Sequence, residues 1–447
     1  MEYVGSKVSR IAGRGSVPGS VAGVRVLLVA PRAGARREGK GRAPFPPLGL
    51  LAVAGATPPE VEVRLVDEAV EPLEYDARWD LVGITSNTAQ APRAYASADA
   101  FRGRGVPVVL GGIHPSALPE EALRHADAVV VGEAEGLWPR VLRDLEQGRL
   151  QRIYRGDGHP RLEGVRVRRD LLRAGAYLAP QTVQTTRGCP YNCSFCSVTR
   201  FFGATFRTRP VEEVVGEVAA LPGDLVVFVD DNIVGRPTYA RRLFGALRGL
   251  GKKWLSQASV NNLRDGELVK LAAASGCRGL FIGFETLSLP GLRSLRKGTN
   301  DVRTYAEVIA RLHSCGIGVI GAFILGLDED GPDVFDRVLE FSYRARVDLL
   351  QVSILTPFPG TALWQQLEGE GRIFDRDWSK YNGNHVVFWP KRLSPERLQE
   401  GFRYVLREAY SLRGIWRRLS GPHRHSLLFG SMNLVFRRGV RNYLARG

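Results

Sequence analysis

Residues 188–196 read Gly188-Cys189-Pro190-Tyr191-Asn192-Cys193-Ser194-Phe195-Cys196, and three of the chain's five cysteines lie in this short stretch. Thiolates are the usual ligands of iron-sulfur clusters, and three of them can hold three irons of a [4Fe-4S] cluster while the fourth iron stays open. A zinc site is the alternative, but it normally needs a fourth Cys or His at comparable spacing, and none is nearby. We therefore predict that Cys189, Cys193 and Cys196 are metal ligands at a catalytic centre.

The Cys-x3-Cys-x2-Cys spacing, with the aromatic Phe195 before the last cysteine, resembles the signature of the radical S-adenosylmethionine (SAM) superfamily. The triplet follows an apolar, Thr-rich stretch at 182–186 that is typical of a strand. The resemblance implies an enzyme in which SAM binds the open iron through its amino and carboxylate groups and receives one electron from the cluster. Cys277 and Cys315 lie far from the triplet and are interpreted as small buried side chains.

Residues 181–365 alternate apolar runs with helical patterns, which indicates repeated units of one strand and one helix. Six strands are expected, at 182–186, 225–229, 254–260, 279–284, 318–325 and 349–355. Six such units match the partial (β/α)6 barrel of the radical SAM superfamily. In a parallel barrel the active site lies at the carboxyl ends of the strands, so polar residues there are the candidates for binding SAM.

Four of these expected strands carry such candidates. The second strand ends in Asp230, Asp231 and Asn232, the third carries Gln257 and Ser259 on one face, the fourth ends in Glu285, and the fifth contains Gly321. The resemblance implies that an acid binds the SAM ammonium group, that Gln257 and Ser259 bind its ribose or carboxylate, and that the fifth strand meets its adenine. The alternatives are a helix cap for one acid, edge polarity for the third strand and a solvated acid at the fourth.

Residues 24–150 contain five further apolar runs, each followed by Gly, Pro, Ser or Asn and then by a helical stretch. This pattern predicts an α/β fold, a flavodoxin-like (Rossmann-type) parallel sheet whose ligand lies at the carboxyl ends of the strands. The loops expected there resemble those of the cobalamin (B12)-binding domain that precedes many radical SAM domains. On that resemblance the cobalamin-binding residues are Ser86, Thr88, Gly112, His114, Gly132 and Glu133.

The N-terminal resemblance has one departure. The Asp-x-His-x-x-Gly signature that supplies a histidine to cobalt in other cobalamin proteins is absent, because Pro115 and Ser116 follow His114. Within the radical SAM branch this absence implies a cobalt without a protein imidazole below it. His114 is then either a residue at the edge of the corrin ring or a loop residue hydrogen-bonded to backbone, and a vestigial domain without cobalamin is a further alternative.

The composition is that of a globular protein, with 44% apolar and 24% charged residues, and the length of 447 residues favours more than one domain. Residues 1–23 are expected to form a flexible leader, because they lack the apolar core of a signal peptide, and the Arg-rich residues 151–180 to form a linker. No apolar run reaches the roughly 18 residues that cross a bilayer. The net charge of +16 suits nucleic acid, but the basic residues are mostly scattered arginines, so no nucleic-acid partner is predicted.

Residues 366–447 are expected to form a mostly helical C-terminal region. Tyr381, Asn382 and His385 lie in a stretch similar to one in a subgroup of cobalamin-type radical SAM proteins that includes the hopanoid C-methylases, and the subgroup's usual acid is Asn382 here. Tyr381 and His385 are candidates for reaching substrate or for packing in the core. From Arg413 onward, arginines alternate with aliphatic and aromatic residues, which fits either an anionic membrane surface or helices packed on the barrel.

Together the resemblances imply a cobalamin-dependent radical SAM C-methyltransferase. One SAM would give its methyl group to cobalt, and a second would yield a 5'-deoxyadenosyl radical that opens an unactivated substrate carbon to methyl transfer. A radical SAM cyclase or rearrangement enzyme is the nearer alternative, and a cobalamin-binding sensor or carrier the more distant one. The expected partners are a small-molecule substrate, such as a lipid or natural-product intermediate, and a reductant such as flavodoxin or ferredoxin. The reduced cytoplasm, or the inner face of its membrane, is the expected location.

Overall fold

The structure is a computed structural model that describes residues 23–34, 42–156, 158–421 and 426–445. The chain folds into two compact units. The N-terminal unit comprises the described residues up to Thr182 together with Arg200–Phe202, and the C-terminal unit comprises Val183–Thr199 and the described residues from Gly203 onward. The leader predicted for residues 1–23 lies, apart from Gly23, outside the described residues.

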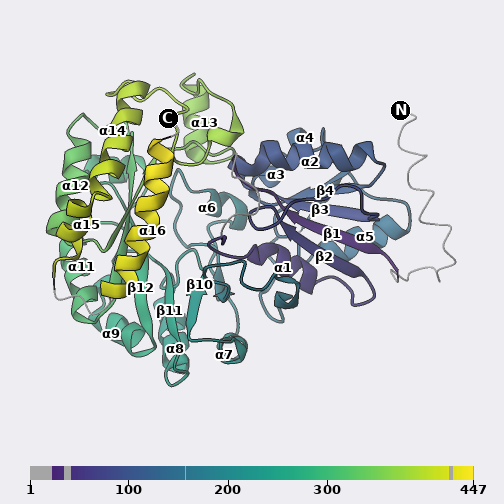
Figure 1. Ribbon diagram of the computed structural model, residues 1–447, viewed down its shortest axis with the longest axis horizontal. Helices are drawn as coiled ribbons and strands as arrows, with labels where there is room; N and C mark the ends of the chain where they lie inside the picture. Colours follow the sequence, from purple (N-terminus) through teal and green to yellow (C-terminus); the bar gives the residue numbers. More distant parts are fainter. Residues whose placement is uncertain (1–22, 35–41, 157, 422–425, 446–447) are drawn as a thin grey trace. The chain divides into compact units, whose positions relative to one another are not determined.

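The N-terminal unit is built on a six-stranded parallel sheet with the strand order β2-β1-β3-β4-β5-β6 (Figure 1). The strands are β1 Arg25–Ala30, β2 Glu62–Asp67, β3 Leu81–Thr85, β4 Val108–Gly111, β5 Ala128–Val131 and β6 Ile153–Arg155. Most of the apolar side chains of the central strands are buried, as expected for a parallel sheet that helices cover on both faces. This arrangement confirms the predicted doubly wound fold.

Helices lie on both faces of this sheet. They are α1 Leu48–Gly55, α2 Ala91–Gly103, α3 Ile113–Ala117, α4 Pro119–Ala122 and α5 Trp138–Glu146. Side chains of α1 and α5 belong to one apolar cluster on the sheet, within which Trp138 Nε1 donates a hydrogen bond of 2.9 Å to Thr57 Oγ1. Figure 1 shows α2 and α4 on the opposite side of the sheet from α1.

The sixth strand of this sheet comes from the segment that the sequence predicts to be a linker. Strand β6 pairs with β5 in parallel, and its central residue Tyr154 is buried with its hydroxyl donating to Asp144 Oδ2 at 3.1 Å. Strand β6 has only three residues and lies among arginines, so its sequence shows no alternation of apolar and polar side chains. The strand is recognised only from its pairing with β5 at the edge of the sheet.

The C-terminal unit contains a second six-stranded sheet, in the order β14-β13-β12-β11-β10-β7. Its strands are β7 Thr182–Val183, β10 Leu225–Phe228, β11 Lys253–Ala258, β12 Cys277–Glu285, β13 Gly318–Leu325 and β14 Leu349–Ile354. The pairs from β10 to β14 are all parallel, and a large apolar cluster surrounds them. The predicted partial (β/α)6 barrel is therefore present.

The first barrel strand is shorter than expected from the run at 182–186. The carboxylate Oδ1 of Asp230 accepts hydrogen bonds from the backbone N–H groups of Thr185 and Thr186 and from both hydroxyls. Because these amides bind a side chain, they cannot pair with a neighbouring strand, and the run divides into β7 and β8 Thr186–Arg187. Strand β8 pairs with β9 Arg207–Thr208 in a short antiparallel pair, and the cysteine loop and α6 lie between the two strands in sequence.

Helices α7 Val211–Ala220, α8 Pro237–Leu247, α9 Gly266–Ala274, α11 Tyr305–Ser314 and α12 Val334–Arg344 alternate with the barrel strands. Two short helices, α6 Ser197–Phe202 and α10 Leu289–Ser294, follow the cysteine triplet and β12. The C-terminal region adds α13 Ala362–Gly369, α14 Pro395–Ala409, α15 Leu412–Leu419 and α16 Ser426–Leu444. No helix in the described parts of the chain is both long and apolar enough to cross a membrane.

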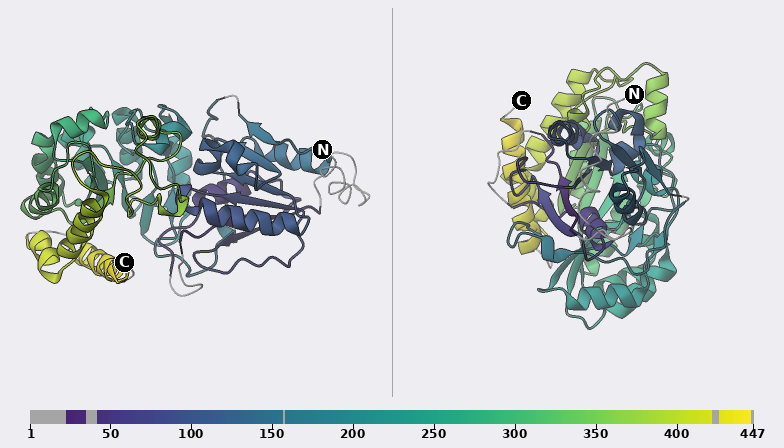
Figure 2. Two further views of the ribbon diagram at one scale, coloured as in Figure 1. Left: turned by 90° about the horizontal axis from the view of Figure 1, so that it is seen from above. Right: turned by 90° about the vertical axis from the view of Figure 1, so that its right-hand side faces the viewer.

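The C-terminal helices are attached to the barrel at two places. Phe429 of α16 packs on Gly279 of β12 and Gly318 of β13, where a Cβ atom would overlap its ring. The fully buried Arg418 of α15 donates a hydrogen bond of 2.8 Å to Asn433 Oδ1 of α16. Figure 1 and Figure 2 show α16, in yellow, beside α14 and α15 on one side of this unit.

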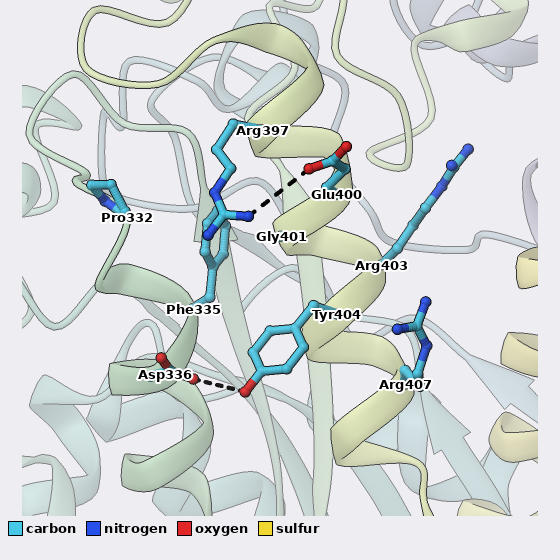
Figure 3. Close-up of a pocket in the computed structure, with 9 residues that line it drawn as sticks. All are labelled: Pro332, Phe335, Asp336, Arg397, Glu400, Gly401, Arg403, Tyr404 and Arg407. Atoms are coloured by element: carbon cyan, nitrogen blue, oxygen red, sulfur yellow. Dashed lines mark hydrogen bonds and ion pairs between the residues drawn. The ribbon is translucent and has the colours of Figure 1, made fainter.

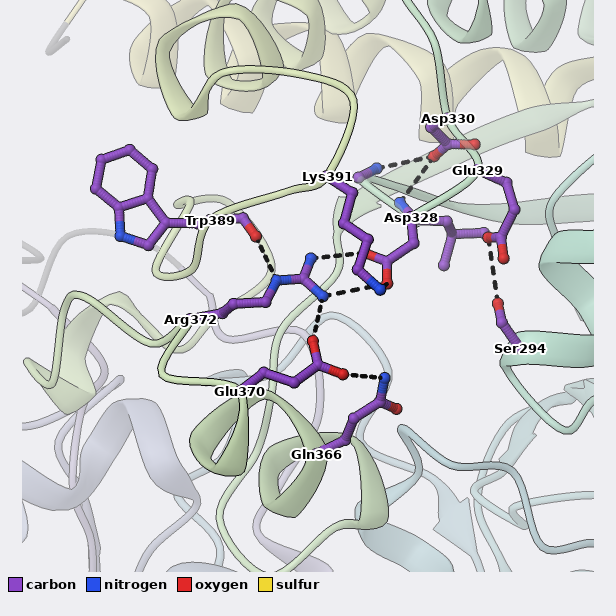
Figure 4. Close-up of polar contacts among 11 residues, drawn as sticks. Ser294, Asp328, Glu329, Asp330, Gln366, Glu370, Arg372, Trp389 and Lys391 are labelled. Atoms are coloured by element: carbon purple, nitrogen blue, oxygen red, sulfur yellow. Dashed lines mark hydrogen bonds and ion pairs between the residues drawn. The ribbon is translucent and has the colours of Figure 1, made fainter.

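An ion-pair network attaches the segment before α14 to the loop after β13 (Figure 4). Arg372 forms two hydrogen bonds, of 2.6 and 3.1 Å, with the carboxylate of Asp328, and Lys391 Nζ lies 3.0 Å from the same group. Arg372 also contacts Glu370 at 2.8 Å and donates to the Trp389 carbonyl at 2.7 Å. A bidentate arginine pair is among the stronger polar contacts, so this network holds the C-terminal region at the carboxyl end of the barrel.

Candidate functional site

A cavity of about 460 Å³ opens at the carboxyl ends of the barrel strands, entirely within the C-terminal unit. Its wall contains the cysteine loop, the residues after β10, and side chains from β11 to β14. Predicted residues that line it are Cys189, Cys193, Phe195, Cys196, Asp231, Asn232, Gln257, Ser259 and Glu285. The structure therefore brings the cysteine triplet and most of the predicted SAM-binding residues around one space.

Backbone hydrogen bonds hold the cysteine loop. Gly188 has a φ of +82°, a conformation that favours glycine, and its N–H donates to Asp231 Oδ2 at 3.1 Å. The N–H of Ser194 donates to the Leu295 carbonyl at 3.0 Å, and the Ser194 carbonyl accepts from Leu363 at 2.8 Å. The loop thus presents its three free thiols from a fixed backbone.

The thiols suit a large cluster better than a single metal ion. Burial raises the pKa of Cys189, and that of Cys193 to about 11, so both are protonated at neutral pH until a metal displaces the protons. Within the described ranges, no three Cys, His, Asp or Glu side chains converge on one point as a mononuclear ion requires. Three thiols that face a roomy cavity, with no fourth protein ligand beside them, fit a [4Fe-4S] cluster with one open iron.

The two acids after β10 have different environments. Asp231 faces the cavity, and burial raises its pKa to about 6. Asn232 is buried between the strands, with Nδ2 3.1 Å from Ser259 Oγ and 3.9 Å from Cys189 Sγ. Asp230 is not part of the cavity wall, and its hydrogen bonds to Thr185 and Thr186 indicate a structural role instead of the predicted contact with SAM.

The barrel strands place alternate side chains on the cavity wall. Strand register pairs Gln257 with Phe281 and Gly283 with Ala322, and all four line the cavity. Gly321, predicted to meet adenine, faces the opposite way, because a Cβ there would lie 2.8 Å from Val347 on the barrel's outer side. The residue of this strand that faces the cavity is its neighbour Ala322.

The end of β12 carries an acid in an unusual backbone conformation. Glu285 has a φ of +65° and follows a register shift in the pairing with β13, so its carboxylate turns into the cavity beside Gly283. Lys297 Nζ lies 2.9 Å from Glu285 Oε1 and 5.9 Å from the centre of the Phe195 ring. Burial opposes the charge on Lys297, yet Glu285 and Cys193 raise its pKa above the ordinary value.

Sequence analysis misses Lys297. The only local signal is a lysine in a chain whose basic residues are mostly arginine, shortly after the acid that it contacts. A buried ion pair that lines a cavity together with three thiols marks a functional position, since charges are rarely buried without a partner.

The C-terminal candidates separate into core and cavity residues. Tyr381 is buried and its hydroxyl donates to the Asp375 carbonyl at 2.7 Å. His385 Nδ1 lies 3.0 Å from Asn382 Oδ1, and burial lowers the pKa of this histidine. Of the three, only Asn382 lines the cavity, where an amide stands in place of the subgroup's acid.

The predicted cobalamin residues lie at the carboxyl edge of the N-terminal sheet. Ser86 is buried after β3, and its hydroxyl has no hydrogen-bond partner among the described residues. Gly132 follows β5 with a φ of +88° and open space where a Cβ would lie. Gly112 has a φ of +95°, and a Cβ there would lie 2.6 Å from Thr85 Oγ1. A free hydroxyl and bare backbone at this edge fit a ligand that approaches the main chain closely.

Two other residues predicted at this edge, His114 and Glu133, already have protein partners. His114 is fully buried with Nε2 3.3 Å from Glu121 Oε1, and the Glu133 carboxylate lies 3.5 Å from His159. Thr88 is buried at the start of a short 3-10 helix, Thr88–Gln90. The structure therefore favours Ser86 and Gly132 over His114 and Glu133 as residues that a ligand could contact, whereas Gly112 packs against Thr85 and Ser86.

A second hollow, of about 440 Å³, lies between α12 and α14 on the outside of the barrel (Figure 3). Its polar side chains contact one another: Tyr404 donates to Asp336 at 2.8 Å, and Arg397 lies 3.9 Å from Glu400. Gly401 lies directly against the ring of Phe335 at its floor. The hollow holds no cysteine, and its two acids pair with Tyr404 and Arg397, so it is a seam between two helices.

Comparison with known proteins agrees with this geometry. The model of the Radical SAM superfamily matches residues 183–342, that of the B12 binding domain matches residues 39–142, and a domain of unknown function matches residues 361–426. Bacteriochlorophyllide d C-12(1)-methyltransferase from Chlorobaculum tepidum is 33% identical over 84% of this chain and 85% of its own length. The chain belongs to the family of cobalamin-dependent radical SAM methyltransferases.

Further similarities support the family and the fold. The enzyme is 27% identical to the hopanoid C-2 methylase of Rhodopseudomonas palustris over 83% of this chain and 75% of that protein. The radical SAM methyltransferase TsrM from Kitasatospora setae, solved with cobalamin and a [4Fe-4S] cluster, superposes with a TM-score of 0.61 at 18% identity, over 77% of this chain and 78% of TsrM. OxsB, solved with cobalamin and SAM, gives a TM-score of 0.65 at 14% identity over 94% and 72% of the two chains.

Membership in this family identifies the protein as a radical SAM methyltransferase. Its cofactors are a [4Fe-4S] cluster, SAM and cobalamin, and its substrate is a small molecule. The sensor or carrier alternative is thereby set aside in favour of an enzyme.

Proposed function

We propose that the enzyme methylates an unactivated carbon of an apolar small molecule by a radical mechanism. The observation that carries the proposal is the single cavity in which three free thiols, an acid, an amide and a buried ion pair meet. The cofactors supply the difficult chemistry when bound: the cluster and SAM provide a 5'-deoxyadenosyl radical, and cobalamin carries the methyl group.

The protein's part is to position these groups. Cys189, Cys193 and Cys196 would hold the cluster. Asp231 faces the same cavity and would accept hydrogen bonds from the SAM ammonium group, which stabilises its charged form despite burial. Asn232 keeps the ends of β10 and β11 at a fixed separation next to Cys189.

Other cavity residues would complete the SAM site. Gln257 and Ser259 present polar side chains for ribose or carboxylate oxygens, and Ala322 leaves room for adenine beside β13. Glu285 and Lys297 form a paired acid and base whose charges cancel. Asp231 is then the unbalanced charge among these residues, which suits a cationic cofactor and a neutral substrate.

The cavity also has an apolar wall. Its large apolar members include Phe281, Phe323, Ile324, Ile354, Leu355 and Phe358. Such a surface favours a substrate with extended apolar parts, and the names of the relatives specify a bacteriochlorophyllide and a hopanoid. We propose a lipid or an apolar natural-product intermediate as the substrate class, and flavodoxin or ferredoxin as the source of electrons.

Anaerobic assays of the reconstituted enzyme test this function. With SAM, cobalamin, a strong reductant and extract from the native organism, we expect both 5'-deoxyadenosine and S-adenosylhomocysteine. Each of the three cysteine-to-Ala variants should form neither product above background while the N-terminal unit still binds cobalamin. Formation of 5'-deoxyadenosine alone would indicate a cyclase or rearrangement enzyme, and retained SAM cleavage in a cysteine variant would refute the ligand assignment.

A further inference from the structure

Helices α15 and α16 expose an unusual number of large apolar side chains. These are Leu412, Trp416, Leu427, Leu434, Val435 and Phe436, about half of all such exposed residues in the described chain. Trp416 is 69% exposed and Leu427 90% exposed, so both project well clear of the protein. Scattered single leucines are normal on a protein surface, but a concentration on two neighbouring helices marks an interaction site.

The charges on this surface all have one sign. Arg413, Arg417, Arg438 and Arg441 are exposed on the same two helices, and the chain has no Asp or Glu from Leu412 to its last residue. In the described residues, no ion pair includes any of these four arginines. Arg417 stacks on the Tyr343 ring at 4.1 Å. We use the name outer face for the surface made by Leu412, Trp416, Leu427, Leu434 and these four arginines.

Helical geometry places the apolar and basic side chains of α16 together. Leu427, Leu434, Arg438 and Arg441 follow one another at intervals of seven, four and three residues, which puts them along one side of the helix. Leu412 and Trp416 are one turn apart on α15. On α16 the hydrophobic and cationic groups therefore share one side, and on α15 Leu412 and Trp416 lie one above the other.

The opposite side of α16 packs on the barrel. The apolar residues of the outer face are therefore not the side of the helix that packs in the protein core. Phe429 packs against Gly279 and Gly318, and Asn433 Nδ2 donates to the Asp348 carbonyl at 2.8 Å. Arg418 joins α15 to α16 beneath the surface. These contacts use the buried side of each helix and hold the outer face toward solvent.

We propose that the outer face docks onto an anionic lipid surface. Amphipathic helices with leucine and tryptophan on an arginine-rich face enter the boundary between headgroups and acyl chains, and arginines there are attracted to lipid phosphates. A second copy of the chain is a poorer occupant, because a symmetric contact would place arginines against arginines. Nucleic acid would leave the exposed leucines and Trp416 without an apolar environment. The proposal does not depend on the methylation chemistry.

Vesicle flotation of the full-length reconstituted enzyme tests the proposal. We expect binding to vesicles of phosphatidylcholine with phosphatidylglycerol, weaker binding at high salt, and little binding to phosphatidylcholine alone. The double variant Trp416→Glu/Leu434→Glu should lose about tenfold or more in affinity, because charges replace the groups that enter the lipid. Replacement of the four arginines by Gln should remove the preference for anionic lipid.

Leu178→Glu is the matched control, since Leu178 is also exposed but lies in the N-terminal unit. It should bind vesicles like the wild type, and all variants should keep SAM cleavage, which shows that they are folded. A wild type that does not float, or that floats equally with neutral vesicles, would overturn the proposal. Self-association that the double variant abolishes, without vesicle binding, would assign the face to a second copy and overturn it as well.

Discussion

Lys297 Nζ lies 2.9 Å from Glu285 Oε1 in the cavity that Cys189, Cys193 and Cys196 also line. Glu285 reaches this position through a left-handed backbone conformation, which costs energy in a residue with a side chain. A strained, buried acid paired with a mostly buried lysine costs stability, so we infer that the pair has a role at the site.

Lys297→Met should leave Glu285 buried without a partner. We expect a loss of about 3 kcal/mol in unfolding free energy and a SAM affinity lowered by about tenfold or more. The double variant Lys297→Met/Glu285→Gln removes the unpaired charge and should regain most of the stability. If it also regained SAM affinity, measured by calorimetry, the pair would be structural and not part of the SAM site.

Asp230 should make stability depend on pH. Burial raises its pKa from 3.8 to about 6, so between these values the folded protein binds more protons than the unfolded chain. Stability should therefore fall as the pH rises through this range, by at most about 3 kcal/mol. Asp230→Asn keeps an oxygen for Thr185 and Thr186 and should remove this residue's share of the slope in urea unfolding, while Asp231 and Asp330, whose pKa values burial also raises to about 6, keep theirs. An unchanged slope would contradict the assigned role.

Gly321 and Ala322 offer a matched pair on one strand. Gly321→Ala should cost about 1 to 3 kcal/mol of stability through overlap with Val347, and should leave the KM for SAM unchanged. Ala322→Leu should fill the cavity, which weakens SAM or substrate binding with a smaller effect on stability. If Gly321→Ala raised the KM for SAM and Ala322→Leu did not, Gly321 would be the residue that contacts adenine.

Ser86→Ala and Gly132→Val test the cobalamin edge. The Ser86 hydroxyl has no hydrogen-bond partner among the described residues, so Ser86→Ala should change the melting temperature little, yet should lower cobalamin retention if the hydroxyl binds the cofactor. Gly132→Val adds a branched side chain at a φ of +88° and should lower retention further. Cobalamin absorbance after gel filtration measures both, with His114→Gln as the comparison expected to affect folding more than binding.

Local patterns in the sequence predicted most of the architecture. The cysteine triplet and the apolar runs located both sheets, since buried parallel strands need continuous apolar residues. The short strand β6 was not predictable, because its place depends on the edge offered by β5. The division of 182–186 into two strands depends on Asp230, which lies 45 residues from Thr185.

Site residues could be predicted where the residue type itself indicates a binding role. They were harder to predict where the direction of the side chain decides whether a residue faces the cavity. Cys189, Asp231 and Gln257 were predicted because thiols, acids and amides at strand ends indicate binding, and all three line the cavity. Gly321 and Ala322 differ by one residue and face opposite sides, which only the register reveals. Lys297 enters the cavity from beyond α10, and no spacing links it to Glu285 in advance.

The most direct test of the central claim uses SAM labelled with deuterium in its methyl group, in anaerobic turnover with extract from the native organism. We predict that the labelled methyl group appears in one product and that 5'-deoxyadenosine and S-adenosylhomocysteine form in equal amounts. A product that lacks the label while 5'-deoxyadenosine accumulates, or labelled product formed by the Cys193→Ala variant, would contradict radical methylation at this site.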